Sequence, residues 1–325
     1  MNDKKFLDVR NLTVHYETKQ ETVYAVNDVS FSMKKGETLG LVGETGAGKT
    51  TIARAILGIL PIPPAHISGG EILLDGQDVL QTSEKEMHEV RGKKITMIFQ
   101  DPMTALNPVM TVGRQIEEVV EIHEKISRAE AKKRAEAMLE MVGIPAARYG
   151  EYPHQFSGGM KQRVVIAMAL ACNPDLLLAD EPTTALDVTI QAQVLDLMRK
   201  LNKEKDTSCI LITHDLGVVA EMCDKVAIVY AGEILESGSL ADIFDHPSHP
   251  YTVGLFGSIP SIDGDEERLN PVPGMTPDPA NLPSGCKFHP RCASCTEECK
   301  TADVKMREIA PGHFCRCINV ERGER

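Results

Sequence analysis

The 325-residue sequence contains no apolar run that approaches the about 20 residues needed to cross a bilayer as a helix. Residues 1–10, MNDKKFLDVR, also lack the apolar stretch of a secretory signal. We therefore expect the protein to stay in the cytosol, where thiols are kept reduced.

The sequence also lacks an excess of positive charge. Lys and Arg number 35 against 47 Asp and Glu, which gives a formal net charge of −12 at pH 7. Because such a chain repels phosphate backbones, we expect no nucleic-acid partner. The apolar content of 42% is ordinary for a globular protein, and the length allows one large core with room for a second small domain.

What the sequence does contain is a phosphate-binding loop, GETGAGKT, at residues 43–50. An apolar run at 39–42 favours a buried strand before it, and apolar residues at helical spacing follow at 52–60. Glycines let the backbone N–H groups converge on phosphates at a helix N-terminus, where Lys49 adds a full charge and the Thr50 hydroxyl can ligate Mg²⁺. The predicted ATP-binding residues of this loop are Gly43, Glu44, Thr45, Gly46, Ala47, Gly48, Lys49, Thr50 and Thr51.

An acidic pair follows a second apolar run. Residues 175–179 favour a buried parallel strand, and Asp180 and Glu181 come at its carboxyl end, where ligands bind in open α/β sheets. We predict that Asp180 holds Mg²⁺ through water. Glu181 is the predicted general base that polarises an attacking water.

Weaker signals narrow the class of ATPase. FSGGMKQR, at 156–163, places a serine and two glycines ahead of an apolar, Ala-rich helix at 164–171, which is a second candidate phosphate site. Gln100 and His214 each follow or end an apolar strand, and TALD at 184–187 comes soon after Glu181. Each signal is weak alone, but their order and spacing together are specific.

In this order the motifs resemble the nucleotide-binding subunits of ATP-binding-cassette (ABC) transporters, over about residues 7–238. The resemblance implies an α/β fold with the P-loop NTPase core of an ABC ATPase, which binds and hydrolyses ATP with Mg²⁺. Its site residues would be Tyr16 against adenine, Thr50, Gln100 and Asp180 at Mg²⁺, Glu181 and His214 as catalytic residues, and Asp187 along the dimer interface. Ser157, Gly158, Gly159 and Gln162 would form the signature that contacts the ATP held by the opposite protomer.

The segment between the two phosphate sites is predicted to be helical. Residues 112–126 have apolar positions at helical spacing, and 128–142 are rich in Ala, Glu and Lys. A helical subdomain at about 101–172 would carry the signature away from Lys49 of its own chain. Two protomers arranged head to tail would then close two nucleotide sites, with ATP joining them and hydrolysis releasing them.

The C-terminal part resembles the dipeptide and oligopeptide importers of this family. HPYT at 249–252, PVPG at 271–274, PSGCKFHPRC at 283–292 and APGH at 310–313 occur in the order these importers show. The resemblance implies ATP-driven peptide import at the cytoplasmic face of the membrane, as a peripheral subunit. The implied partners are a second ABC ATPase subunit in a heterodimer, two transmembrane permease subunits and, indirectly, an extracytoplasmic peptide-binding protein.

Other activities remain open at this point. Nickel and oligosaccharide importers share much of the architecture. A soluble, non-transport ABC ATPase would need a coiled-coil insertion or a second cassette, and the sequence has neither. A further interpretation is an iron–sulfur redox sensor whose ATPase is regulatory.

Six of the nine cysteines lie within residues 286–317. In a reducing cytosol, clustered cysteines are more often metal ligands than disulfides, and from spacing alone four thiolates suit zinc and an iron–sulfur cluster equally. The importer resemblance implies a 4Fe–4S cluster on Cys286, Cys292, Cys299 and Cys317, while Cys295 and Cys315 are spares or displace one of the four. The alternative is free thiols in a loosely packed tail.

These expectations divide the chain into a nucleotide-binding domain at 1–262 and a C-terminal extension at 263–325 that bears the cysteine cluster. The extension is too small to build much core alone, so we expect a metal to staple it. The scattered Cys172, Cys209 and Cys223 lie in apolar context and are expected in the core.

Overall fold

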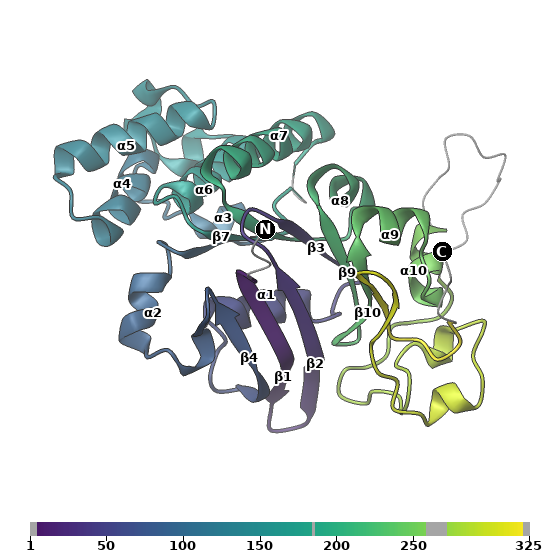
Figure 1. Cartoon of the computed structure of the whole chain (residues 1–325). Coiled ribbons are helices and arrows are strands. Elements are labelled where there is room, and N and C mark those ends of the chain that lie inside the picture. Colours follow the sequence, from purple (N-terminus) through teal and green to yellow (C-terminus); the bar gives the residue numbers. More distant parts are fainter. Residues whose placement is uncertain (1–4, 184–185, 258–271, 321–325) are drawn as a thin grey trace.

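The computed structural model describes residues 5–183, 186–257 and 272–320, without the side chains of residues 102 and 103. Two sheets form its framework (Figure 1): one runs in the order β2-β1-β4-β5 and the other in the order β11-β12-β10-β9-β3-β8-β7-β6. In the described ranges, no helix combines the length and the apolar character that a membrane span requires.

The strands are β1 (Leu7–Glu17), β2 (Thr22–Met33), β3 (Thr38–Val42), β4 (Ala65–Leu74), β5 (Gln77–Asp78), β6 (Ile95–Ile98), β7 (Leu176–Asp180), β8 (Ser208–Thr213), β9 (Lys225–Tyr230), β10 (Glu233–Ser239), β11 (Arg307–Ala310) and β12 (His313–Cys315). The helices are α1 (Lys49–Leu57), α2 (Glu84–Val90), α3 (Pro102–Ala105), α4 (Val112–His123), α5 (Arg128–Met141), α6 (Gly158–Leu170), α7 (Val188–Lys205), α8 (Leu216–Met222), α9 (Leu240–Asp245) and α10 (Pro250–Phe256).

The centre of the larger sheet is parallel and buried on both faces. Every residue of β3, β7 and β8 is buried, which explains why these strands read as continuous apolar runs. Their side chains alternate between two cores: Leu177 and Leu211 belong to one, Leu178 and Ile210 to the other. Because β3, β7 and β8 pair in parallel, their carboxyl ends meet at one edge of the sheet.

A helical layer lies to one side of this sheet. In Figure 1, α4 and α5 project away from the antiparallel sheet of β1, β2 and β4. Val112, Ile116 and Val120 recur at intervals of one helical turn and are fully buried, and Ser127 begins α5 in a capping box with Glu130. The helices expected at 112–126 and 128–142 are therefore present, with α4 ending slightly earlier than expected.

The C-terminal segment extends the core sheet. In Figure 1 it lies beside β9 and β10. Strand β12 pairs antiparallel with β10, and β11 pairs with β12. Residues 272–286 contain neither helix nor strand, as expected of a Pro-rich linker. The expected domain boundary at 262–263 lies outside the described residues.

This segment has little core of its own and relies on the main one. Ile309, Cys315 and Cys317 form a small separate cluster. Phe288, by contrast, is buried in the main core, with its ring centroid 5.4 Å from that of Tyr230 and 5.3 Å from that of Tyr251. Aromatic packing therefore attaches the segment to the body of the protein.

Candidate functional site

Glycines shape the loop between β3 and α1. A Cβ added to Gly43 would lie 2.0 Å from the carbonyl oxygen of Val229, and one added to Gly48 would lie 2.2 Å from that of Ala25. Gly48 also has a φ of 101°, which L side chains rarely adopt. Only glycine therefore lets this loop pack closely on β9 and β2 and deliver the chain into α1.

Lys49 is folded back into the loop that precedes it. Its Nζ donates to the carbonyl oxygens of Gly43 at 2.7 Å and Glu44 at 3.0 Å, and its side chain is buried. Burial lowers the pKa of Lys49, while the charges of Glu181, Asp180 and Glu44 oppose that shift. The ammonium group thus lies within the loop, where the negative charge of a bound phosphate would pair with it.

Asp180, at the end of β7, lies beside Thr50 at the start of α1. The Thr50 hydroxyl makes a hydrogen bond with the Asp180 carboxylate, and only 4% of Asp180 is exposed. Burial raises the pKa of this carboxyl, while the Thr50 hydrogen bond and the charge of Lys49 lower it. A hydroxyl and a buried carboxylate are the oxygen ligands that Mg²⁺ prefers, so these residues fit the expected ion.

Glu181 brings together two residues that the sequence places far apart. Gln100 Nε2 donates to Glu181 Oε2 at 2.7 Å, and His214 Nδ1 lies 3.2 Å from Glu181 Oε1. The backbone of Glu181 leaves β7 in the left-handed region, with a φ of 46°, while its N–H donates to Ile212 of β8 at 2.8 Å. The three polar residues that follow β6, β7 and β8 thus form one cluster.

Tyr16 lies on β1, in the antiparallel sheet. Its hydroxyl is 3.4 Å from Thr51 Oγ1 in the first turn of α1. The contact places the Tyr16 hydroxyl beside the start of α1, while stacking of its ring on adenine stays a prediction.

Ser157 caps α6, and its side-chain oxygen accepts from the N–H of Met160. Ser157 and Gly158 are exposed, whereas a Cβ on Gly159 would lie 2.6 Å from Ile190 Cγ2 of α7. Figure 1 shows the ribbon of α6 apart from that of α1. The signature therefore offers an exposed helix N-terminus on a different part of the fold from the loop.

Gln162 does not join this exposed end. Its side chain is 1% exposed, and within the described residues neither of its polar atoms has a hydrogen-bond partner. It lies one turn before Val165 and Ile166, which are buried, so the helical period turns it inward. Asp187 caps α7 by accepting from Ile190 N at 3.0 Å, while the first half of TALD lies outside the described residues.

A contact between the C-terminal segment and the loop was not predicted from the sequence. The guanidinium of Arg291 binds both carboxylate oxygens of Glu44, at 2.8 and 3.1 Å. The residues are 247 positions apart, so no local pattern connects them. The only available hint was a charged residue inside the run FHPRC.

The predicted four-cysteine set lines one small cavity. Cys286, Cys292, Cys299 and Cys317 face it, together with His249 and Phe288, whereas Cys295 and Cys315 do not. All nine cysteines are free thiols. In the part of the chain that the structure describes, no group of three or more His, Cys, Asp or Glu side chains is placed to hold a metal ion.

Known protein families and relatives are similar to this chain in sequence. A family model described as "ABC transporter" matches residues 26–184, and one described as "Oligopeptide/dipeptide transporter, C-terminal region" matches residues 235–299. The oligopeptide transport ATP-binding protein OppD of Bacillus subtilis is 52% identical over 96% of this chain and 88% of its own length. The dipeptide transport ATP-binding protein DppD of the same organism is 52% identical over 97% of this chain and 94% of its own.

Solved structures match the fold. A dimeric ATP-binding cassette, MJ0796, in a post-hydrolysis state bound to ADP and Pi, has a TM-score of 0.65 and 30% identity and covers 72% of this chain and 98% of its own. The protein cbiO1 of Clostridium perfringens has the same TM-score at 28% identity and covers 75% and 92%. These matches confirm the predicted α/β ABC ATPase core. The chain belongs to the ATP-binding proteins of the oligopeptide and dipeptide ABC transporters, which confirms the resemblance noted in its motifs.

Proposed function

We propose that this chain binds and hydrolyses ATP to power the import of short peptides through partner membrane subunits. The observation that supports this proposal most strongly is the convergence at one edge of the parallel sheet. Lys49 follows β3, Asp180 ends β7 with Glu181 directly after it, and His214 follows β8. A cation, a metal-binding carboxylate and a general base thus occur together where a triphosphate would lie.

The residues divide the work of hydrolysis between them. The loop N–H groups and Lys49 would bind the phosphates, and Thr50, Gln100 and Asp180 would hold Mg²⁺, which would neutralise phosphate charge. Glu181 takes the proton of the attacking water, with His214 beside it at the γ-phosphate. Gln100 orients the Glu181 carboxylate through the 2.7 Å hydrogen bond, so it can link metal binding to the base.

The second half of each nucleotide site comes from another protomer. Ser157, Gly158 and Gly159 present the N-terminus of α6, a 13-residue helix whose dipole favours phosphate. Because this end is exposed and lies apart from α1, it suits an ATP held by a facing chain. The dimeric state of the solved cassette MJ0796 supports this arrangement.

Binding of Mg·ATP tests the site directly. Lys49→Ala removes the phosphate-binding cation, and we expect calorimetry to show a large loss of affinity. Lys200→Ala, at an exposed lysine of α7, is the matched control and should bind as the wild type does. Unchanged binding by Lys49→Ala would contradict the assignment of the loop.

For the extension, we propose residues 263–325 as a unit held by a 4Fe–4S cluster on Cys286, Cys292, Cys299 and Cys317. The support is that these four thiols line a common cavity while Cys295 and Cys315 lie outside it. Thiolate sulfurs are the usual ligands of such a cluster, whose role here would be to fasten a segment with little core. A single zinc ion is the alternative occupant.

Metal analysis of anaerobically purified protein distinguishes these cases. We expect iron and sulfide with a visible absorption band, and loss of both in Cys292→Ser. Cys295→Ser is the matched control and should retain the metal. Zinc without iron, or no metal, would contradict the cluster; equal loss in both variants would contradict the ligand set.

The remaining assignments concern cargo and partners. We place the chain on the cytoplasmic face of the membrane, in a heterodimer with a second ATPase subunit. That heterodimer would dock on two permease subunits. The permease subunits would receive peptides from an extracytoplasmic peptide-binding protein. The similarity of this chain to oligopeptide and dipeptide transport proteins favours peptides, rather than nickel or oligosaccharides, as the cargo. Uptake of labelled peptides by vesicles with the complete transporter tests the cargo, and uptake of nickel alone would contradict it.

A further inference from the structure

Arg291 connects the cysteine-bearing segment to the phosphate loop. It immediately precedes Cys292, and its guanidinium forms a two-pronged ion pair with the carboxylate of Glu44, at 2.8 and 3.1 Å. Glu44 follows Gly43, so it is the second residue of the loop. Arg–carboxylate pairs of this geometry are among the stronger polar contacts in proteins because both hydrogen bonds are charge-assisted.

The Arg291 side chain is held firmly from its own side. Its Nε donates to the carbonyl oxygen of Pro273 at 2.8 Å, and its terminal nitrogens donate to the carbonyl oxygen of Val272 at 3.2 Å and the hydroxyl of Tyr230 at 3.3 Å. The side chain is only 6% exposed. Arg291 therefore presents a fixed donor fork to the loop.

Glu44 is held at its backbone as well. Its N–H donates to the hydroxyl of Tyr251 at 3.3 Å, and its carbonyl oxygen accepts from Lys49 Nζ at 3.0 Å. Tyr251 packs against Phe288 of the same C-terminal segment. Glu44 is thus held at three points. Arg291 binds its side chain, Tyr251 accepts from its N–H, and Lys49 donates to its carbonyl oxygen.

We propose that Arg291 is a positioning residue for ATP binding: the C-terminal segment holds the phosphate loop in its binding conformation through the Arg291–Glu44 pair. This inference rests on the proposed ATP site. Preorganising the loop lowers the entropy lost when phosphates bind, and pairing Glu44 also offsets a negative charge that would repel them. The segment therefore acts on nucleotide affinity as well as on stability.

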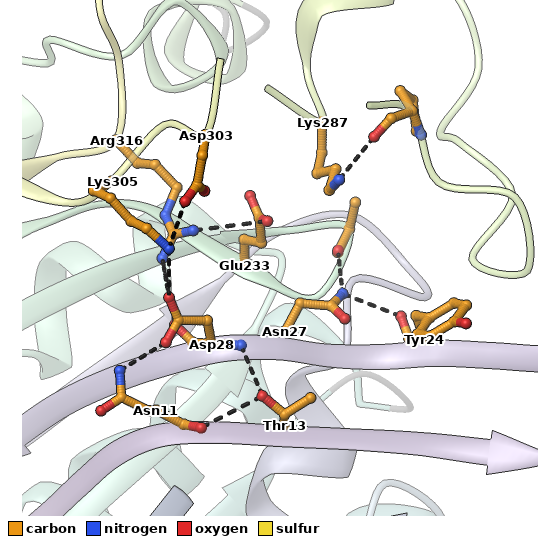
Figure 2. Close-up of polar contacts among 12 residues, drawn as sticks. Asn11, Thr13, Tyr24, Asn27, Asp28, Glu233, Lys287, Asp303, Lys305 and Arg316 are labelled. Carbon is orange, nitrogen blue, oxygen red and sulfur yellow. Dashed lines mark hydrogen bonds and ion pairs between the residues drawn. The ribbon is translucent and has the colours of Figure 1, made fainter. Parts of the chain in front are cut away.

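A second contact between the segment and the core provides a matched control. Figure 2 shows Lys305 and Arg316 of the segment against Asp28 and Glu233. Lys305 Nζ lies 3.7 Å from Asp28 Oδ2, and the lysine is 64% exposed. Lys305→Ala therefore removes an ion pair between segment and core without touching Glu44.

The test measures Mg·ATP affinity of the full chain by calorimetry in a double-mutant cycle. We expect Arg291→Ala to weaken binding roughly 10- to 100-fold, the range of a hydrogen bond to a charged group. In a Glu44→Ala background the same change should have little further effect. Arg291→Lys keeps the charge but not the fork, so it should bind with intermediate affinity.

Hydrogen exchange of the loop amides at residues 43–50 gives a readout that does not require ATP. We expect faster exchange in Arg291→Ala and no change in Lys305→Ala, with both variants still folded by circular dichroism. Wild-type affinity in Arg291→Ala, an equal loss in Lys305→Ala, or additive effects in the cycle would overturn the proposal. Failure of the wild type to bind ATP would instead overturn the proposed function, and loop exchange would still report on the contact.

Discussion

Lys49 and Asp180 carry opposite charges into the interior of the protein, and burial shifts the pKa of each toward its neutral form. Each is partly compensated by the other, and Thr50 adds a hydrogen bond to Asp180. Such charges cost stability unless a ligand completes their pairing. The site is therefore arranged for binding Mg·ATP rather than for maximal stability of the chain.

The raised pKa of Asp180 predicts that its carboxylate lowers the stability of the fold, although it would contribute to the binding of Mg·ATP. Because the folded-state pKa is raised, the ionised carboxyl destabilises the fold at pH 7, and this penalty disappears below about pH 3.9, where the group is protonated in both states. We expect Asp180→Asn to be at least as stable as the wild type at pH 7 by urea denaturation without nucleotide. It should lose the Mg²⁺-dependent part of ATP binding. A clear loss of stability at pH 7, or Mg²⁺ dependence equal to that of the wild type, would contradict this reading.

At the scale of elements, the C-terminal segment is attached through β12. His313 Nε2 and Glu236 Oε1 of β10 are 2.7 Å apart, and both side chains are fully buried. Glu236 also accepts from the backbone N–H groups of Ser248 at 2.7 Å and His249 at 2.9 Å. One carboxylate thus joins β10, β12 and the start of α10.

This geometry predicts unequal costs for removing the two partners. Glu236→Ala leaves a buried histidine and two backbone donors without their acceptor, so we expect a loss of about 3–5 kcal/mol in the free energy of unfolding. His313→Ala should cost less, because the carboxylate keeps its backbone donors. Urea denaturation measures both, with Lys305→Ala as the surface control, expected within about 1 kcal/mol of the wild type. A larger loss for His313→Ala than for Glu236→Ala would contradict the account.

Local patterns predicted several elements around the site, but neither the antiparallel sheet of β1, β2, β4 and β5 nor the contacts between distant elements. The strand predicted at 39–42 and the helix predicted after residue 50 are β3 and α1 in the structure. Both were predictable because a strand buried on both faces is a continuous apolar run, and a helix repeats apolar residues at every turn. The inward orientation of Gln162 was missed, since the signature motif gives no indication of which face of α6 packs inward. The pairs Arg291–Glu44 and His313–Glu236 depend on tertiary packing, which no short window of sequence records.

At the scale of the whole molecule, the two helix N-termini that we propose as phosphate-binding sites lie on different parts of the fold. Lys49 begins α1 beside the parallel sheet, and Ser157 caps α6 in the helical layer. We propose that both ends bind one nucleotide when two chains face each other, so dimerisation should depend on ATP and end with its hydrolysis.

The most direct test is the molecular mass of the Glu181→Gln variant in solution with Mg·ATP, together with its partner ATPase subunit. This change keeps the shape of Glu181 but removes the base, so we expect hydrolysis to slow by roughly 10²–10⁴-fold and the ATP-bound dimer to persist. Light scattering should then give the mass of a dimer, and adding Ser157→Arg to the same variant should return the mass of a monomer. A monomeric mass for Glu181→Gln under saturating Mg·ATP would contradict the account.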